Sequence, residues 1–200
     1  MLAYAAAWLA FGAIHSLSSR EPAKAELRRL AGRAMRLCWN ILAIAELAAV
    51  LAIGHAAITQ DPFDRPIWLA AAQAGLIAAG VAVLALATRS YDIRRFLGLA
   101  QLRGTIEDDE PFRADGLLAF VRHPLYLGGL LLLAGLVRDT QSLQTALYAT
   151  LYILVGLRFE ERALIRRFGE TYIAYRARVP ALLPWRGRAW PPGTIAARPP

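Results

Sequence analysis

The chain has 200 residues, of which 57% are hydrophobic and 19% charged, and its formal net charge is +8. This composition excludes an ordinary soluble globule and indicates a membrane protein. A nucleic-acid-binding protein is also disfavoured, because all but two of the 23 basic residues fall into two polar connections between apolar segments and the C-terminal segment.

Five almost wholly apolar segments follow one another at 1–17, 37–58, 67–88, 124–137 and 142–157. The first three approach or reach the roughly 20 residues that cross a hydrocarbon core about 30 Å thick. The last two are shorter and are joined only by residues 138–141, which predicts a tight helical hairpin, with a buried soluble hairpin as the alternative. The first segment lacks a basic flank and a cleavage site, so we expect a genuine helix rather than a signal peptide.

The predicted fold is all-α, a polytopic integral membrane protein with about five transmembrane helices in a single domain over 1–184. Residues 22–36 mix apolar and basic side chains, which predicts an amphipathic helix at the membrane interface after the first span. Ser18 and Ser19 are expected to cap this helix, with Pro22 in its first turn. Residues 185–200 form a tail rich in proline and arginine, expected to be extended or disordered. The main helices are expected at 1–17, 37–58, 67–88, 124–137 and 142–167.

The basic residues alternate between connections. The second and fourth connections carry only Arg65 and Arg138, whereas the first, the third and the C-terminal segment carry the rest. By the positive-inside rule this predicts a bacterial inner membrane protein with its N-terminus outside and its C-terminus in the cytoplasm. The basic residues are then expected to face anionic membrane lipids rather than nucleic acid.

No metal site is predicted. The acidic run at 107–110 is most simply a solvated face, and the single cysteine, Cys38, excludes both an internal disulfide and a cysteine-rich metal centre. Two ionisable residues nevertheless lie inside apolar segments, where such groups are costly. Glu46 is expected to have a structural partner, an arginine or Asn40, with an acceptor-site role as the alternative, and His15 is expected to form an interfacial polar end.

Residues 122–128, RHPLYLG, open the fourth apolar segment. Pro124 suits the first turn of a helix, and Tyr126 follows His123 by three residues, so the two side chains share one neighbourhood. The alternative interpretation is an interfacial arginine and tyrosine, followed by glycines for close helix packing.

Glu160 and Glu161 follow the fifth apolar segment. Adjacent carboxylates are poorly placed at a helix C-terminus, unless the helix continues and Arg166 and Arg167 neutralise them. A surface ion-pair network is one interpretation. The other is that a carboxylate accepts hydrogen bonds from a ligand ammonium or ribose diol, or positions an arginine.

RHPLYLG, an apolar hairpin, and then FEERALIRRFGETYIAYRARVPALLP together resemble the integral-membrane methyltransferases typified by isoprenylcysteine carboxyl methyltransferase. The resemblance covers about residues 90–185. Residues 13–16 and 36–40 are similar to the methanethiol S-methyltransferase and NnrU-like branch. No GxGxxG motif points to a soluble Rossmann methyltransferase.

The resemblance implies S-adenosylmethionine as methyl donor, held in a cytoplasm-facing pocket. It implies methyl transfer to a lipophilic or small thiol or carboxylate acceptor, with a phospholipid N-methyltransferase or a non-catalytic NnrU-like accessory protein as alternatives. The implied catalytic residues are His123, Glu161 and Arg176. The implied cofactor-binding residues are His123, Leu125, Tyr126, Leu127, Gly128, Glu160, Glu161, Tyr172 and Tyr175.

Overall fold

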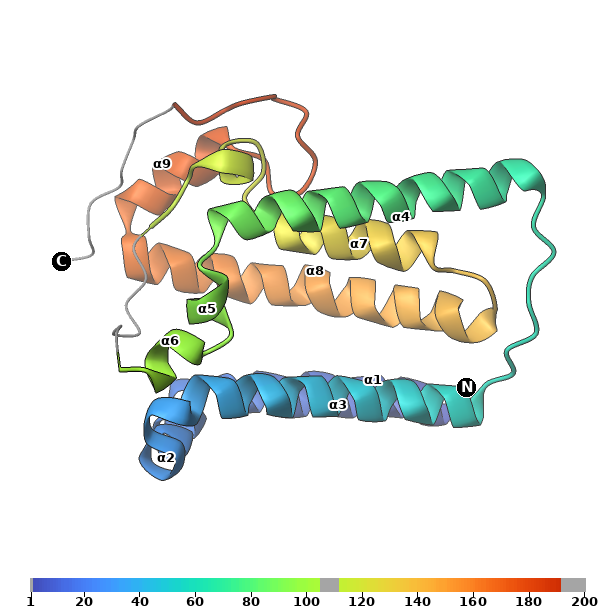
Figure 1. Ribbon diagram of the computed structural model, residues 1–200, viewed down its shortest axis with the longest axis horizontal. Helices are drawn as coiled ribbons and strands as arrows, with labels where there is room; N and C mark the ends of the chain where they lie inside the picture. Colours follow the sequence, from blue (N-terminus) through green and yellow to red (C-terminus); the bar gives the residue numbers. More distant parts are fainter. Residues whose placement is uncertain (1, 105–111, 192–200) are drawn as a thin grey trace. The chain divides into compact units, whose positions relative to one another are not determined.

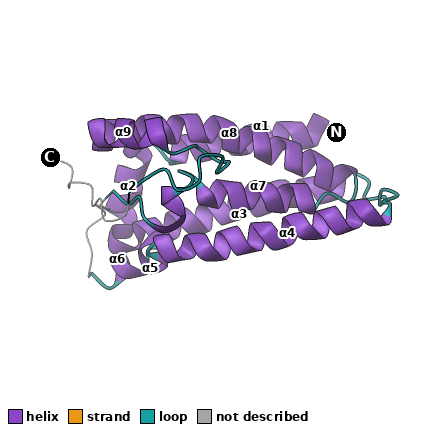
Figure 2. Ribbon diagram, turned by 90° about the horizontal axis from the view of Figure 1, so that it is seen from above, coloured by secondary structure: helices purple, strands orange, loops and turns teal. Residues whose placement is uncertain are grey.

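The structure, a computed structural model, describes residues 2–104 and 112–191, and within these ranges the regular elements are helices apart from one isolated bridge between Pro62 and Asp139 (Figure 2). This confirms the predicted all-α class. The long helices are α1 (Leu2–Ser18), α3 (Met35–Ala57), α4 (Ile67–Ala87), α7 (Pro124–Gly135) and α8 (Thr140–Phe168) (Figure 1). They lie where the sequence places five helices, although α7 ends two residues earlier than expected.

The polar connections contain shorter helices. They are α2 (Glu21–Ala31), α5 (Ile93–Phe96), α6 (Leu99–Leu102) and α9 (Glu170–Arg178), with 3-10 turns at Gly32–Ala34, Thr88–Ser90 and Gly116–Ala119. Only the amphipathic helix over 22–36 was predicted, and the structure divides it into α2, the 3-10 turn Gly32–Ala34 and the first residues of α3. The acidic run at 107–110 and the tail beyond residue 191 lie outside the described residues.

The predicted serine cap of α2 is wrong. Arg20 occupies the capping position without a side-chain hydrogen bond, while Pro22 does lie in the first turn. The hydroxyls of Ser18 and Ser19 instead donate to the carbonyls of His15 and Ser16, at 3.0 and 2.9 Å. Serine hydroxyls readily bond to backbone carbonyls three residues earlier, and here they satisfy the end of α1.

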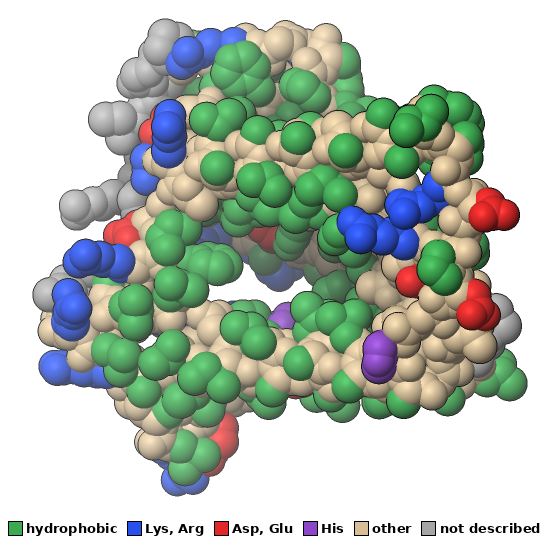
Figure 3. Space-filling model, turned by 45° about the vertical axis from the view of Figure 1, so that its right-hand side comes forward, with side chains coloured by type: hydrophobic (Ala, Val, Ile, Leu, Met, Phe, Trp, Pro, Cys, Tyr) green, Lys and Arg blue, Asp and Glu red, His purple; other side chains and the backbone are tan. Residues whose placement is uncertain are grey.

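Two helical stretches, Glu21–Ala57 and Ile67–Ser90, are long and apolar enough to cross a membrane, judged by length and composition. The apolar helices Leu2–Ser18 and Pro124–Gly135 are shorter. Large apolar side chains such as Leu9, Ile44 and Val81 are exposed, and hydrophobic side chains run along the visible surfaces of the helices (Figure 3). Exposed apolar surface of this kind is unfavourable in water and suggests membrane association.

The chain divides into two compact units. The first comprises Met1–Phe63, Asp92–Asp108 and Arg138–Tyr148, and the second comprises Asp64–Tyr91, Asp109–Val137 and Ala149–Pro200. The single domain over 1–184 stays a prediction.

In the first unit, α1 packs along α3 (Figure 1). The buried residues of α1 are Tyr4, Trp8 and Phe11. Because they are spaced by three or four residues, they lie on one side of the helix. Tyr4 is fully buried, and a Cβ atom on Gly54 of α3 would lie only 2.6 Å from its ring. The Tyr4 hydroxyl is hydrogen-bonded to Thr145 at 2.7 Å, which ties the start of α8 to the same unit.

In the second unit, glycines allow α4 and α7 to approach closely. A Cβ atom on Gly80 would lie 3.0 Å from the carbonyl oxygen of Gly128, and one on Gly128 would lie 2.7 Å from Leu84 Cγ. A Cβ atom on Gly135 would lie 2.9 Å from the carbonyl oxygen of Gln73. Small residues at such contacts let helix backbones pack together, which agrees with the packing interpretation for Gly128 but not for Gly129, where a Cβ atom would meet no atom within 4 Å.

We expect Gly135→Ala to destabilise the protein by about 1–3 kcal/mol, because the added methyl group overlaps the α4 backbone. Gly129→Ala on the same helix is the control, since a Cβ atom there meets no atom within 4 Å. The measurement is thermal unfolding in detergent, followed by helical circular dichroism. Equal melting temperatures for the two variants would contradict the tight contact.

Candidate functional site

The polar residues of the two sequence motifs meet within the second unit. Arg122 and His123 immediately precede α7, whose first residue is Pro124. Glu160 and Glu161 lie near the end of α8, which continues to Phe168. Gly169 then adopts φ +54°, a conformation that favours glycine, and separates α8 from α9. Because α8 continues past the glutamates, their carboxylates do not face its C-terminal carbonyls.

A buried ion pair between Arg122 and Glu161 forms the centre of the site. Arg122 Nε and Nη2 both donate to Glu161 Oε1, at 2.7 and 2.5 Å. The two side chains are 9% and 6% exposed. Arg122 Nη1 donates to the carbonyl oxygen of Val179 and, at 3.1 Å, to that of Arg176. One guanidinium therefore joins α8 to the end of α9.

Glu161 has two further partners. His123 Nε2 lies 3.3 Å from its Oε1, and Arg176 Nε lies 3.3 Å from its Oε2. Burial by itself would raise the pKa of this carboxyl, but hydrogen bonds from His123 and Arg122 and the charge of Arg122 outweigh it and lower the pKa from 4.5 to about 2. The arginines that neutralise Glu161 are thus Arg122 and Arg176, rather than Arg166 and Arg167.

The neighbouring Glu160 has a different environment. The Tyr126 phenol donates a hydrogen bond to its Oε2, and His123 Nδ1 lies 3.9 Å from its Oε1. The His123 and Tyr126 rings stack at a centroid distance of 5.5 Å and an interplanar angle of 13°. The Glu160 side chain is 42% exposed, against 6% for Glu161. Of two adjacent carboxylates, one is saturated by protein partners and the other is accessible.

The chain after α9 returns to the start of α7. The backbone N–H groups of Arg122 and His123 donate to the carbonyl oxygens of Pro180 and Ala181, at 2.9 and 3.0 Å. These two bonds fix the backbone that carries Arg122 and His123, so the positions of the motif side chains depend on a segment almost sixty residues away.

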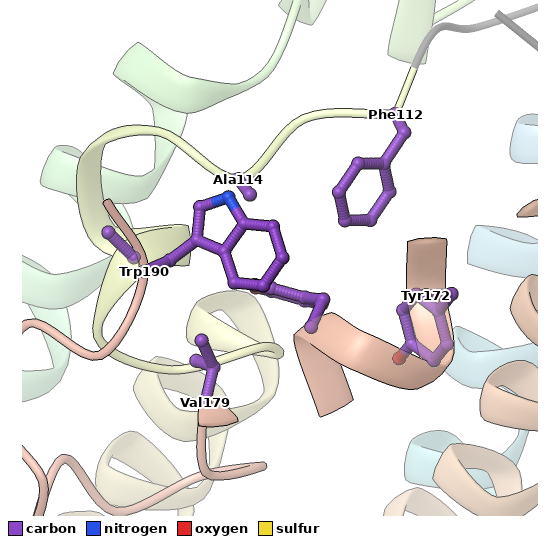
Figure 4. Packing of buried hydrophobic residues seen from close by; sticks show 7 residues of the cluster. Phe112, Ala114, Tyr172, Val179 and Trp190 are labelled. Atoms are coloured by element: carbon purple, nitrogen blue, oxygen red, sulfur yellow. The ribbon is translucent and has the colours of Figure 1, made fainter. Parts of the chain in front are cut away.

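An aromatic core supports this arrangement (Figure 4). The Phe112 and Trp190 rings pack edge-to-face on Tyr175, with centroids 5.2 and 5.3 Å away, and the Tyr175 hydroxyl donates to the carbonyl of Leu118 at 2.6 Å. Burial raises the pKa of Tyr175 above its usual value of 10, so the phenol stays neutral. The core consists of Phe112, Ala114, Ala119, Tyr172, Tyr175, Val179 and Trp190.

Within the described part of the predicted tail, residues 185–191, Trp190 is packed against the protein, and for residues 192–200 the extended or disordered tail stays a prediction. The Trp190 side chain is 6% exposed, and Arg178 lies 5.6 Å from the centre of its indole ring. Backbone N–H groups of Ala189 and Trp190 both donate to the carbonyl of Ala119. Burial of an aromatic side chain outweighs the ordering cost of this short segment.

Tyr172 contributes a buried hydroxyl beside the ion pair. The residue is 2% exposed, and among the described residues its hydroxyl oxygen finds no hydrogen-bond partner. Burial, reinforced by the charge of Glu161, raises the pKa of Tyr172 above 10 and keeps it protonated. A neutral donor without a partner is uncommon in a protein interior and marks a place where a ligand group can bind.

The structure brings five of the predicted site residues into one connected cluster, namely His123, Tyr126, Glu160, Glu161 and Arg176. Leu125 and Leu127 are half-buried on α7, Gly128 faces α4, and Tyr175 faces the aromatic core. The catalytic and cofactor-binding roles of all the predicted site residues, including the five in the cluster and Tyr172, stay predictions.

Arg122 was not predicted as the main partner of Glu161, and Phe112 and Trp190 were not predicted to support the site. A buried carboxylate in so apolar a chain requires a cationic partner. Arg122, next to His123 in the first motif, was the basic residue that could have indicated this partner. The buried aromatic residues left no such signal, because nothing in their local sequence distinguishes them from interfacial ones.

The cluster contains two carboxylates, two guanidinium groups, an imidazole and neutral phenols. In the described part of the chain, no three His, Cys, Asp or Glu residues gather as they would around a metal ion. The half-exposed Arg176 and Glu160 offer one cationic and one anionic contact. The arrangement is suited to a small ligand that itself carries charges of both signs.

Comparison with known proteins gives several matches of one kind. The chain is 41% identical over 133 residues to methanethiol S-methyltransferase 2 of Bradyrhizobium diazoefficiens. The aligned residues make up 62% of this chain and 51% of that protein. This chain is 30% identical over 189 residues to the methanethiol S-methyltransferase of Crocosphaera subtropica, covering 89% and 72% of the two chains. The chain thus spans about half the length of the Bradyrhizobium relative. No family model matches the chain, and no solved structure matches it.

The depressed pKa of Glu161 predicts a pH dependence of stability. The carboxyl titrates lower in the folded protein than in the unfolded chain, so its contribution of about 3 kcal/mol is present above about pH 4.5 and is lost as the pH falls towards 2. Glu161→Gln should lower the melting temperature at neutral pH and remove this acid-dependent part.

Thermal unfolding of both proteins between pH 2 and 7 tests this prediction. Glu160→Gln is the matched control and should retain the acid-dependent loss, because its carboxylate is half-exposed and bonded mainly to one phenol. Parallel pH curves for wild type and Glu161→Gln would show that the ion pair does not stabilise the fold.

Proposed function

Because the chain belongs to the methanethiol S-methyltransferase family, we propose that it transfers a methyl group from S-adenosylmethionine to a small thiol at the cytoplasmic face of a membrane. The names of the relatives from Bradyrhizobium, Crocosphaera and Mycobacterium tuberculosis support a thiol acceptor. The order of the two sequence motifs supports the methyl donor.

The observation that carries the proposal is the contrast between the two adjacent glutamates. Glu161 is balanced by two arginines, whereas Glu160 is half-exposed and, within the described residues, is bonded by a phenol rather than by a guanidinium. Its negative charge therefore attracts a cationic ligand. S-Adenosylmethionine carries a sulfonium and an ammonium group, together with hydroxyls that can donate to a carboxylate.

The other residues of the cluster fit the remaining groups of this donor. Arg176 is 50% exposed and offers a guanidinium to the carboxylate of the amino-acid part. The buried Tyr172 hydroxyl offers a further hydrogen bond. His123 and the stacked Tyr126 ring supply a flat aromatic surface beside Glu160.

Little covalent help is required from the protein, because the donor supplies a methyl group already activated on a positively charged sulfur. The residues of the chain then act mainly by positioning and by excluding water. Glu161 holds Arg122, and Arg122 holds the carbonyls at the end of α9, so the surface that receives the donor is rigid before binding. Such preorganisation lowers the entropic cost of binding.

A membrane location suits the apolar exposed surfaces of the helices and the alternation of basic connections. We propose an inner-membrane protein with its N-terminus outside and its C-terminus cytoplasmic, where a soluble donor is available. Membrane lipids would cover the exposed apolar side chains.

Calorimetric titration of the purified protein with S-adenosylmethionine or its demethylated product tests donor binding. Glu160→Gln should weaken binding about tenfold or more, since a charge-assisted hydrogen bond contributes about 1.5–3 kcal/mol. His123→Ala should also weaken it, by removing the ring that stacks on Tyr126. Glu170→Gln, an exposed carboxylate in the first turn of α9, should bind as wild type does. No binding by the wild type would contradict the proposal.

Methyl-labelled donor identifies the acceptor. We expect label to enter methanethiol and not a phospholipid extract or a prenylcysteine. Label in phospholipid would favour a phospholipid N-methyltransferase instead. Tight donor binding without transfer to any of these acceptors would favour a non-catalytic accessory protein.

A further inference from the structure

The segment that follows α9 forms a short loop that is held at both ends within the second unit. At its start, the carbonyl oxygens of Pro180 and Ala181 accept hydrogen bonds from the backbone that precedes α7. At its end, Trp190 is buried, and its backbone N–H donates to the carbonyl of Ala119. Residues 182–188 between these two attachments are called the 182–188 loop below, and Figure 1 draws them in dark red.

The 182–188 loop is also held along its length. The N–H of Gly187 donates to the carbonyl of Pro184 at 3.1 Å and closes a tight turn, in which Gly187 has φ +60°. Arg186 Nη1 donates to the carbonyls of Ala177 and Arg178, at 2.8 and 3.1 Å, which satisfies the end of α9. The exposure of side chains at the tip is therefore a property of a folded loop.

The tip of the loop presents large apolar side chains. Leu183 is 63% exposed and Trp185 is 69% exposed, on either side of the exposed Pro184. Trp190, five residues further along the same segment, is only 6% exposed. The segment thus buries one tryptophan and presents the other. Tryptophan collects where membrane meets water, because its ring is apolar and its indole N–H is polar.

The charge around the loop favours an anionic partner. The described segment from residue 171 to residue 191 contains no acidic residue and four basic ones, which are Arg176, Arg178, Arg186 and Arg188. Arginines beside an exposed tryptophan suit the negative surface of the cytoplasmic leaflet. A second copy of the chain fits less well, since it would bring the same positive charges into contact.

The place of the loop in the second unit also fits a lipid surface. Its two attachments lie directly before α7, and α7 packs along α4. The 3-10 turns Thr88–Ser90, after α4, and Gly116–Ala119, before α7, contact each other. Both apolar helices therefore end where the loop is attached. In a membrane protein this is the level at which hydrocarbon gives way to lipid headgroups.

We propose that the 182–188 loop anchors the second unit in the membrane interface, with Leu183 and Trp185 inserted among anionic phospholipids and the loop arginines at the phosphate groups. The inference rests on the membrane location proposed above and does not require the methyl-transfer reaction. Because the start of the loop is bonded to the backbone of Arg122 and His123, the anchor holds the proposed donor site next to the lipid surface.

Spin labelling of the full-length protein tests the insertion. Cys38 is the single cysteine, so Cys38→Ser allows one nitroxide at a time at Leu183→Cys, Glu170→Cys or Val81→Cys. The proteins are reconstituted in vesicles of phosphatidylcholine mixed with phosphatidylglycerol. Collisions of the label with oxygen, which concentrates in the bilayer, are compared with collisions with a water-soluble nickel chelate.

The label at Leu183 should collide with the nickel chelate severalfold less often than the label at Glu170, an exposed residue of α9. Its ratio of oxygen to nickel collisions should lie between that at Glu170 and that at Val81, an exposed residue within the apolar α4. With the label at Leu183, Trp185→Ser should raise nickel access severalfold, whereas Trp185→Phe, which keeps an aromatic ring, should raise it less.

Lipid composition tests the role of charge. In vesicles of phosphatidylcholine alone, nickel access at the Leu183 label should rise, because the attraction of the arginines to anionic headgroups is lost. Arg188→Gln in the mixed vesicles should give part of the same rise. Arg162→Gln, an exposed arginine of α8 outside the loop, is the matched control and should leave access unchanged.

Two results at the Leu183 label would overturn the proposal while leaving the membrane location in place, provided that Val81 is shielded from nickel. The first is nickel access equal to that at Glu170. The second is shielding from oxygen as well as nickel, which would show that protein rather than lipid covers the loop. Equal access in both kinds of vesicle would overturn the anionic partner. Equal nickel access at Val81 and Glu170 would remove the proposed membrane location and this inference together.

Discussion

The Arg122–Glu161 ion pair is the interaction on which the rest of the site depends. Two charges buried this deeply are tolerated only when their remaining hydrogen-bonding groups are satisfied, and here backbone carbonyls, His123 and Arg176 satisfy them. The pair therefore determines the path of the chain after α9 and the orientation of His123. Because it removes Glu161 from contact with solvent, it also leaves Glu160 as the carboxylate that a ligand can reach.

Charged groups are costly in an apolar chain, and each of the two units accommodates its own in a different way. In the second unit the charges cancel locally, and only a half-exposed carboxylate and a half-exposed guanidinium face outwards. In the first unit, His15 Nδ1 lies 3.3 Å from Glu46 Oε2, and Phe11 and Trp39 lie beside the imidazole ring. The described partner of Glu46 is therefore a histidine, and not the arginine or Asn40 that the sequence led us to expect.

The long helices could be predicted closely because their signals are local. Long apolar runs and Pro124 each act within a few residues of chain, whereas α5, α6 and α9 carry no such signal and were not predicted. The site was predictable only in part. Residues in one motif, such as His123 and Tyr126, are neighbours by helical spacing, but the pairing of Arg122 with Glu161, of His15 with Glu46, and the burial of Trp190 depend on tertiary contacts. Short-range patterns carry no information about which distant partner satisfies a buried charge.

The partners of Arg122 at the end of α9 are main-chain oxygens rather than side chains, and the same is true of the bonds that Pro180 and Ala181 accept. Carbonyl oxygens are present whatever amino acid occupies a position. A substitution at one of these positions therefore leaves these hydrogen bonds in place as long as the backbone keeps its course, although Arg176 and Val179 also use their side chains, in the contact with Glu161 and in the aromatic core. The hydrogen bonds that hold Arg122 and His123 in place thus depend on the course of the main chain after α9, and not on which side chains that segment carries.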